Sequence, residues 1–217
     1  MKRIFAIIIF LGTSLPSLAQ DKNEEKYVND EPHYKLDVLG IRNVTTKTFN
    51  GLSLAIAVTP SYRETINGGL IGGIVGAGAK KENGFAFGGL YTSIDTMNGV
   101  IVYPGFGQFQ LTRGIGLSLV QSCQKSQGVF LTIGGGASEY QGLLIAGLAS
   151  GSKVFKGVSL SPLNLTQNLL GLQIGLYNQT KSAKGIQFGL INYIKENPIG
   201  LRILPIMNMR WADKVDD

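Results

Sequence analysis

A unit that opens on glycine recurs about every 14 or 15 residues, and this repeat constrains the fold more than any other feature of the chain. The clearest pair reads Gly-Leu-Gln-Ile-Gly-Leu-Tyr-Asn at residues 171–178 and Gly-Ile-Gln-Phe-Gly-Leu-Ile-Asn at residues 185–192. A fixed period of this kind indicates that every unit forms the same structural element. With a first copy at residues 36–43, twelve units are recognisable, and the others open at Gly51, Gly69, Gly84, Gly99, Gly114, Gly128, Gly142, Gly157 and Gly200.

The residues of each unit alternate with a period of two, which is typical of a β-strand with two unlike faces. In the unit at 171, Leu172 and Ile174 point to one side, and Gln173 and Gly175 point to the other. The same alternation recurs in most other units. Each unit therefore predicts a strand with one apolar face and one small or weakly polar face.

The length of the connections predicts how successive strands are joined. A nine-residue strand spans about 30 Å, whereas the five or six residues that follow it reach at most about 20 Å, too short for a return to a parallel neighbour. We therefore expect an antiparallel meander. A solenoid with two very short strands per coil would escape this limit, but it needs a second apolar wall. The second halves of the units, such as residues 121–127 and 179–184, read as polar turns instead.

The distribution of charge favours closure of this meander in a membrane. A soluble sandwich would carry lysine and glutamate on its exposed strand faces, whereas the expected strands here are nearly free of charge. We therefore predict an all-β fold of about twelve antiparallel strands closed into a transmembrane β-barrel, with a soluble β structure as the alternative. The charged residues between the strands are Lys80, Lys81, Glu82, Asp95, Lys125, Glu139, Lys153, Lys156, Lys181, Lys184, Lys195 and Glu196.

Three residues at one repeat position are candidates to line the lumen of such a barrel: Gln173, Gln187 and Arg202. In an open lumen their polar groups would meet a solute. In a closed lumen they would hydrogen-bond to one another instead.

The two ends of the chain predict export and a single folded domain. Residues 1–19 join a basic start, a short apolar run and a small-residue cleavage site, as in a signal peptide. Residues 20–34 predict a polar flexible segment, residues 35–211 the repeat domain, and residues 212–217 a polar tail. We expect the protein in the bacterial outer membrane or cell envelope.

The units at 171–178 and 185–192, with the ending at residues 198–211, resemble a family of bacterial surface-repeat proteins. The close match covers about the last forty residues, and degenerate copies extend it toward Leu36. This resemblance implies a cell-envelope location and no established activity. The last strand is also similar to the aromatic-ended last strand of outer-membrane barrels, although Trp211 is followed by six more residues.

The residue types needed for catalysis are scarce. His33 is the only histidine and Cys123 the only cysteine, so a base for a nucleophile and a transition-metal site are both unexpected. We predict no catalytic, cofactor or metal site. The net charge of +6 includes two basic residues of the leader, and no basic run points to nucleic acid.

Three functions are compatible with these observations. The leading hypothesis is a non-enzymatic outer-membrane barrel, in contact with outer-membrane lipids, that serves as a narrow pore, a structural protein or an attachment surface. The second is a soluble periplasmic or surface-displayed β-repeat module that binds partners. The third and weakest is a barrel enzyme that acts on envelope lipids. No protein or solute partner follows from the sequence.

Overall fold

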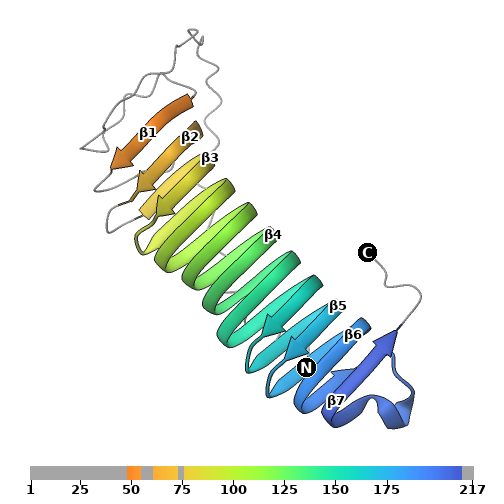
Figure 1. Ribbon diagram of the computed structural model, residues 1–217. Coiled ribbons are helices and arrows are strands. Elements are labelled where there is room, and N and C mark those ends of the chain that lie inside the picture. Colours follow the sequence, from red (N-terminus) through yellow and green to blue (C-terminus); the bar gives the residue numbers. More distant parts are fainter. Residues whose placement is uncertain (1–47, 55–60, 73–75, 212–217) are drawn as a thin grey trace.

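The computed structural model describes residues 48–54, 61–72 and 76–211, which form a single sheet wound into a β-solenoid (Figure 1). Successive turns of the coil stack on one another, so that each turn adds one rung to the sheet. The strands are β1 (Thr48–Leu54), β2 (Ser61–Ile71), β3 (Gly76–Phe87), β4 (Tyr91–Leu160), β5 (Leu163–Ile174), β6 (Tyr177–Ile194) and β7 (Ile203–Trp211), and a 3-10 helix, η1 (Ile199–Leu201), precedes β7.

The pairing of the strands contradicts the predicted antiparallel barrel. β1 to β6 pair in sequence order, and every pair among them is parallel. Only β7 runs antiparallel, against β6. β4 continues for 70 residues because its chain winds through several turns without leaving the sheet. The prediction of about twelve antiparallel, membrane-crossing strands is therefore wrong, since these strands are rungs of a solenoid.

The prediction failed at the second half of each unit. Residues 121–127 and 179–184, which read as turns, are strand in the structure and form a second wall of the coil. Thr180, Ser182 and Ala183 are buried in that wall. In these two segments the inward side chains are small or polar, so the segments lack the apolar alternation by which strands are recognised in a sequence. Because each turn consists of two short walls, the second wall brings the chain back to the start of the next turn. The short connections therefore no longer exclude parallel strands.

A column of glycines fixes the register between turns. Residues pair as Gly51 with Gly68, Gly68 with Gly84 and Gly84 with Gly99 near the start, and Gly171 pairs with Gly185 near the end. In the described residues nine of these column glycines have φ between 128° and 136°: Gly51, Gly68, Gly84, Gly99, Gly114, Gly128, Gly142, Gly157 and Gly171. Two predicted unit starts are corrected, because Gly68 rather than Gly69 occupies the column and Gly200 lies in η1.

Gly128 illustrates why this column requires glycine. Its φ of 131° lies in a region that side chains rarely adopt. A Cβ at this position would also overlap the backbone oxygen of Gly114 in the turn below. The missing side chain thus permits both the sharp corner and the close stacking of turns.

The inside of the coil changes in character along its length. Two clusters hold most of the buried apolar side chains. The first comprises Ile66, Leu70, Ala79, Ala86, Ile94, Met97, Ile101, Tyr103, Phe109 and Cys123, and the second comprises Phe130, Tyr140, Leu144 and Phe155, with Leu169, Ala183 and Ile194 extending it into the last turns. The last turns also bury polar side chains, among them Ser159, Asn164, Thr166, Gln173, Asn178, Thr180, Ser182, Gln187 and Asn192. The apolar core therefore belongs mainly to the first two thirds of the solenoid.

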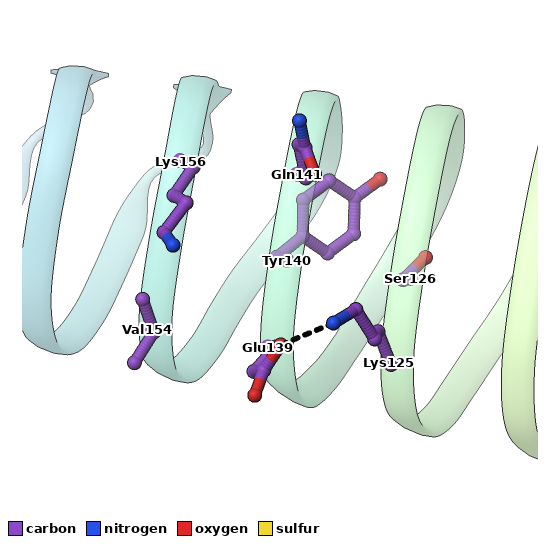
Figure 2. A pocket seen from close by; sticks show the side chains of 7 residues that line it. All are labelled: Lys125, Ser126, Glu139, Tyr140, Gln141, Val154 and Lys156. Carbon is purple, nitrogen blue, oxygen red and sulfur yellow. Dashed lines mark ion pairs between the residues drawn. The ribbon is translucent and has the colours of Figure 1, made fainter. Parts of the chain in front are cut away.

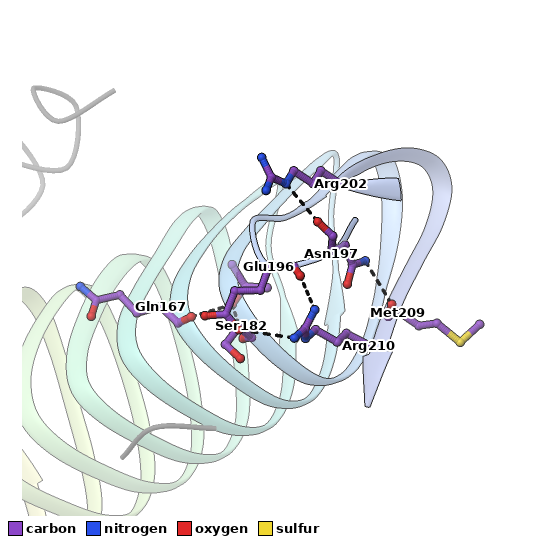
Figure 3. Close-up of polar contacts among 8 residues, drawn as sticks. Gln167, Ser182, Glu196, Asn197, Arg202, Met209 and Arg210 are labelled. Atoms are coloured by element: carbon purple, nitrogen blue, oxygen red, sulfur yellow. Dashed lines mark hydrogen bonds and ion pairs between the residues drawn. The ribbon is translucent and has the colours of Figure 1, made fainter. Parts of the chain in front are cut away.

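The C-terminal end of the solenoid is closed by η1 and β7 (Figure 3). Asn197 is buried and donates to the carbonyl of Met209 at 3.3 Å and to the side-chain oxygen of Asn208 at 2.9 Å. Arg202 Nε donates to the carbonyl of Asn197 at 3.0 Å. Arg210 donates to the carbonyl of Glu196. These bonds tie β7 across the last turn, where a further parallel strand would otherwise be able to add.

We predict that Gly128→Ala destabilises the solenoid by about 2 to 4 kcal/mol, because it combines an unfavourable φ with a backbone clash. Gly134→Ala in the same turn is the matched control, since its nearest neighbour to a Cβ, the carbonyl oxygen of Ala149, is 3.8 Å away. Urea unfolding followed by circular dichroism measures both variants. Equal midpoints for the two variants would contradict the role of the column.

Two buried tyrosines predict a loss of stability at high pH. Burial raises the pKa of Tyr103 and of Tyr140 above the ordinary value near 10. Above pH 10 the unfolded chain loses these protons while the folded chain keeps them, so the free energy of unfolding falls by up to about 1.4 kcal/mol per pH unit for each tyrosine.

The double variant Tyr103→Phe/Tyr140→Phe should show a shallower decline between pH 10 and 12 than the wild type, as measured by urea midpoints across that range. Tyr91→Phe is the control, because the hydroxyl of Tyr91 donates to Gln108 at the surface. An unchanged slope in the double variant would mean that other groups cause the alkaline loss.

Candidate interaction surface

The strand that follows each column glycine presents a continuous apolar surface to the outside of the coil. In its first and third positions the side chains point outward, while the residue between them points inward. Paired positions stack in register, as Val158 stacks with Leu172 and Leu172 with Ile186. We call this surface the apolar wall, and its residues are Phe85, Phe87, Val100, Val102, Ile115, Leu117, Val129, Leu131, Leu143, Ile145, Val158, Leu160, Leu172, Ile174, Ile186 and Phe188.

Many of these side chains are well exposed despite their size. Ile115 and Leu117 are 54% and 51% exposed in one turn of the wall. Near the end of the coil the wall is widened by Leu176 and Leu190, which are 59% and 69% exposed. Soluble monomers seldom expose contiguous apolar patches beyond about 300 to 600 Å². The apolar wall is therefore a candidate surface for an interaction.

The opposite wall of the coil carries most of the charge. Most of the charged residues that we expected in turns between strands lie on this second wall with their charged groups in solvent, whereas Glu82 is fully buried. Exposed basic residues on this wall are Lys80, Lys81, Lys125, Lys153, Lys181 and Lys195, and Glu139 is an exposed acidic one. The two outer faces of the solenoid are therefore unlike, one apolar and the other polar and mainly basic.

Two of the three candidate lumen residues lie inside the solenoid and contact each other. Gln187 Nε2 donates to Gln173 Oε1 at 2.9 Å, and Gln173 Nε2 donates to Thr166 Oγ1 at 2.7 Å. Both glutamines are fully buried. Arg202 lies apart from them, exposed beside η1. The coil has no barrel lumen for these residues to line, and the glutamines instead fill the space between its walls.

A ladder of buried asparagines runs beside the glutamines and was not predicted. Asn164 Nδ2 donates to Asn178 Oδ1 at 2.7 Å, and Asn178 Nδ2 donates to Asn192 Oδ1 at 2.8 Å. Their recurrence at one repeat position, as in the last residue of the Gly-Leu-Gln-x-Gly-Leu-x-Asn unit, was the available signal. Stacked amides of this kind bond each turn to the next.

A second ladder follows the rim of the apolar wall. It consists of the residues that directly precede the column glycines. Asn67 donates to Asn50 at 2.8 Å, Asn83 to Asn67 at 2.7 Å and Asn98 to Asn83 at 2.8 Å. Arg113 extends this ladder by donating to Asn98 at 3.4 Å. The apolar wall is thus bordered along one edge by polar side chains.

The residue types that bind metals are scattered in the described part of the chain. No group of three or more histidine, cysteine, aspartate or glutamate side chains lies close enough to hold a metal ion in this part of the chain. His33 lies outside the described residues. Cys123 is buried, and burial raises the pKa of its thiol, which lowers its reactivity.

A shallow depression on the charged wall is lined by few groups that could react (Figure 2). Lys125 Nζ lies 2.9 Å from Glu139 Oε2 at its edge. The hydrogen bond and charge of Lys125 lower the pKa of the Glu139 carboxyl. Because both side chains are well exposed, solvent weakens this ion pair. The depression is also lined by Ser126, Tyr140, Gln141, Val154 and Lys156.

No helix among the described residues has the length and apolar character needed to span a membrane. No protein-family model, curated protein or solved structure matches the chain. The expected resemblances to a surface-repeat family and to a small outer-membrane β-barrel are therefore wrong, since no family supports the first and the fold is a parallel solenoid.

We predict that Gln173→Ala destabilises the protein by about 1 to 3 kcal/mol, because it leaves the buried amide of Gln187 without its partner. Gln167→Ala, in the preceding turn, is the control, since the Gln167 side chain is exposed. That change should remain within about 0.5 kcal/mol of the wild type. Urea unfolding distinguishes the two, and equal losses would show that the buried pair adds nothing.

Proposed function

We propose that this protein is an exported, non-catalytic binding scaffold that uses its apolar wall to dock on a protein partner with a flat apolar β-surface. The solenoid provides a rigid, regular face, and the wall provides the contact. The signal-peptide pattern of residues 1–19 supports export. The scarcity of reactive groups among the described residues supports a role in binding.

The observation that carries the proposal is the inversion of polarity in the last turns. There the outward side chains are Val158, Leu160, Leu172, Ile174, Ile186 and Phe188. The inward neighbours between them are Ser159, Gln173 and Gln187, all fully buried. Burial of apolar area is the main favourable term in folding and association. Because these turns direct their apolar side chains outward, a partner that covers the wall would supply the burial that the interior does not.

The chemistry of the partner follows from the wall. Its side chains stand on a regular sheet, and sheets pack face to face at a separation of about 10 Å with interdigitated side chains. The wall carries no charged side chain at its defined positions. Depletion of charge is typical of the core of protein interfaces. A second sheet with an apolar outer face therefore complements it in both shape and polarity.

Protection of the wall in cells tests this function. In a Cys123→Ser background, Ile145→Cys places a thiol on the apolar wall, and Lys153→Cys places one on the charged wall of the same turn. Cells that express the full precursor are treated with a hydrophilic maleimide. We expect the Ile145→Cys thiol to label at least about tenfold more slowly in cells than in dilute purified protein, since the partner covers it.

The Lys153→Cys thiol serves as the matched control and should label equally fast in both settings. For each thiol, the labelling rate in cells is divided by its rate in the dilute protein. Equal ratios for the two thiols would contradict a docked wall. Labelling in permeabilised cells excludes slow entry of the reagent as the cause of protection.

A further inference from the structure

We propose that the partner of the apolar wall is a second copy of this chain, so that two solenoids pack wall against wall. This inference rests on the binding role proposed above and identifies the partner. It follows from the area of the wall, from its composition and from its regularity.

The size of the wall reaches the lower limit expected of a biological interface. The defined wall covers eight rungs, from that of Gly84 to that of Gly185, and at about 4.8 Å per rung it is about 34 Å long. Five residues of strand give it a width of about 15 Å. The flat area is then roughly 500 Å² per copy, so two walls packed together bury about 1,000 Å² in total, the lower limit for a biological interface.

The composition of the wall favours a protein copy over a lipid surface. Elements that lie on lipid combine apolar side chains with lysine, arginine and tryptophan around them. The defined wall positions hold none of these three residues. Arg113, Lys156 and Lys184 lie along one edge of the wall, and six other lysines stand on the opposite wall, so the wall has an apolar centre and a polar rim. Homodimer interfaces are instead apolar and poor in charge at their centres.

The regular repeat makes the wall complementary to itself. Side chains at the first and third positions form straight rows, as Leu160, Ile174 and Phe188 do. Two copies of such a surface present the same spacing between rungs, so the rows of one copy fit between the rows of the other along the whole contact. A two-fold arrangement uses the same patch on both copies and leaves no wall exposed.

Sedimentation equilibrium of the purified full chain tests the proposal across a range of concentrations. We expect the wild type to sediment as a dimer. Leu117→Glu should raise the dissociation constant at least about tenfold, because it buries an unpaired charge in the contact. Gln124→Glu adds the same charge to the charged wall of the same turn and should leave the dimer unchanged. Circular dichroism checks that both variants fold, and the 51% exposure of Leu117 makes this the expected result.

The other outcomes overturn the proposal in distinguishable ways. A wild type that stays monomeric at about 100 µM, while the Ile145→Cys thiol is protected in cells, rejects the second copy and retains the binding function. If the wild type is a monomer that floats with phosphatidylcholine vesicles, and Leu117→Glu abolishes this flotation, the wall binds lipid. That result rejects both the second copy and the docking on a protein partner. Equal weakening of the dimer by Leu117→Glu and Gln124→Glu would also reject the wall as the contact.

Discussion

The close stacking of one turn on the next is the constraint on which the whole structure depends. It requires a residue without a side chain at one corner of each turn, and the glycine column supplies it, as the clash of a Cβ at Gly128 with Gly114 shows. Once the corners stack, all the remaining repeat positions also lie above their counterparts in the previous turn. Identical residues then meet, and the amide ladders of Asn164, Asn178 and Asn192 result directly.

The thinness of the coil explains how polarity is distributed over its faces. The two walls of the coil face each other as packed sheets do, at about 10 Å, and leave room for a single layer of side chains between them. In the first two thirds of the coil this layer is mainly apolar, although it also includes Thr112 and Gln121, and it contains the stacked rings of Tyr140 and Phe155, whose centroids are 5.1 Å apart. In the last turns it contains many amides and hydroxyls, such as Gln173 and Gln187, which hydrogen-bond to each other, beside Leu169 and Ile194. Other apolar residues of those turns lie outside, and the proposed dimer would give them an interior.

The two outer faces assign separate roles to the two halves of each repeat. The half after the column glycine forms the apolar wall. The other half carries most of the lysines, which make the opposite face polar and solvated. A face-to-face pair of solenoids would thus have one apolar centre and two charged outer surfaces, which is also what keeps such a pair from further association.

The sequence by itself determined that the chain is a repeat of strand-forming units, that glycine opens each unit, and that Leu172 and Ile174 face away from Gln173. These features are local, since period and alternation depend only on neighbours along the chain. Only the tertiary structure decided that successive strands are parallel and that residues 179–184 form a second wall. Small side chains such as Ser182 and Ala183 suit either a turn or a narrow interior, and only their packing between stacked turns distinguishes the two.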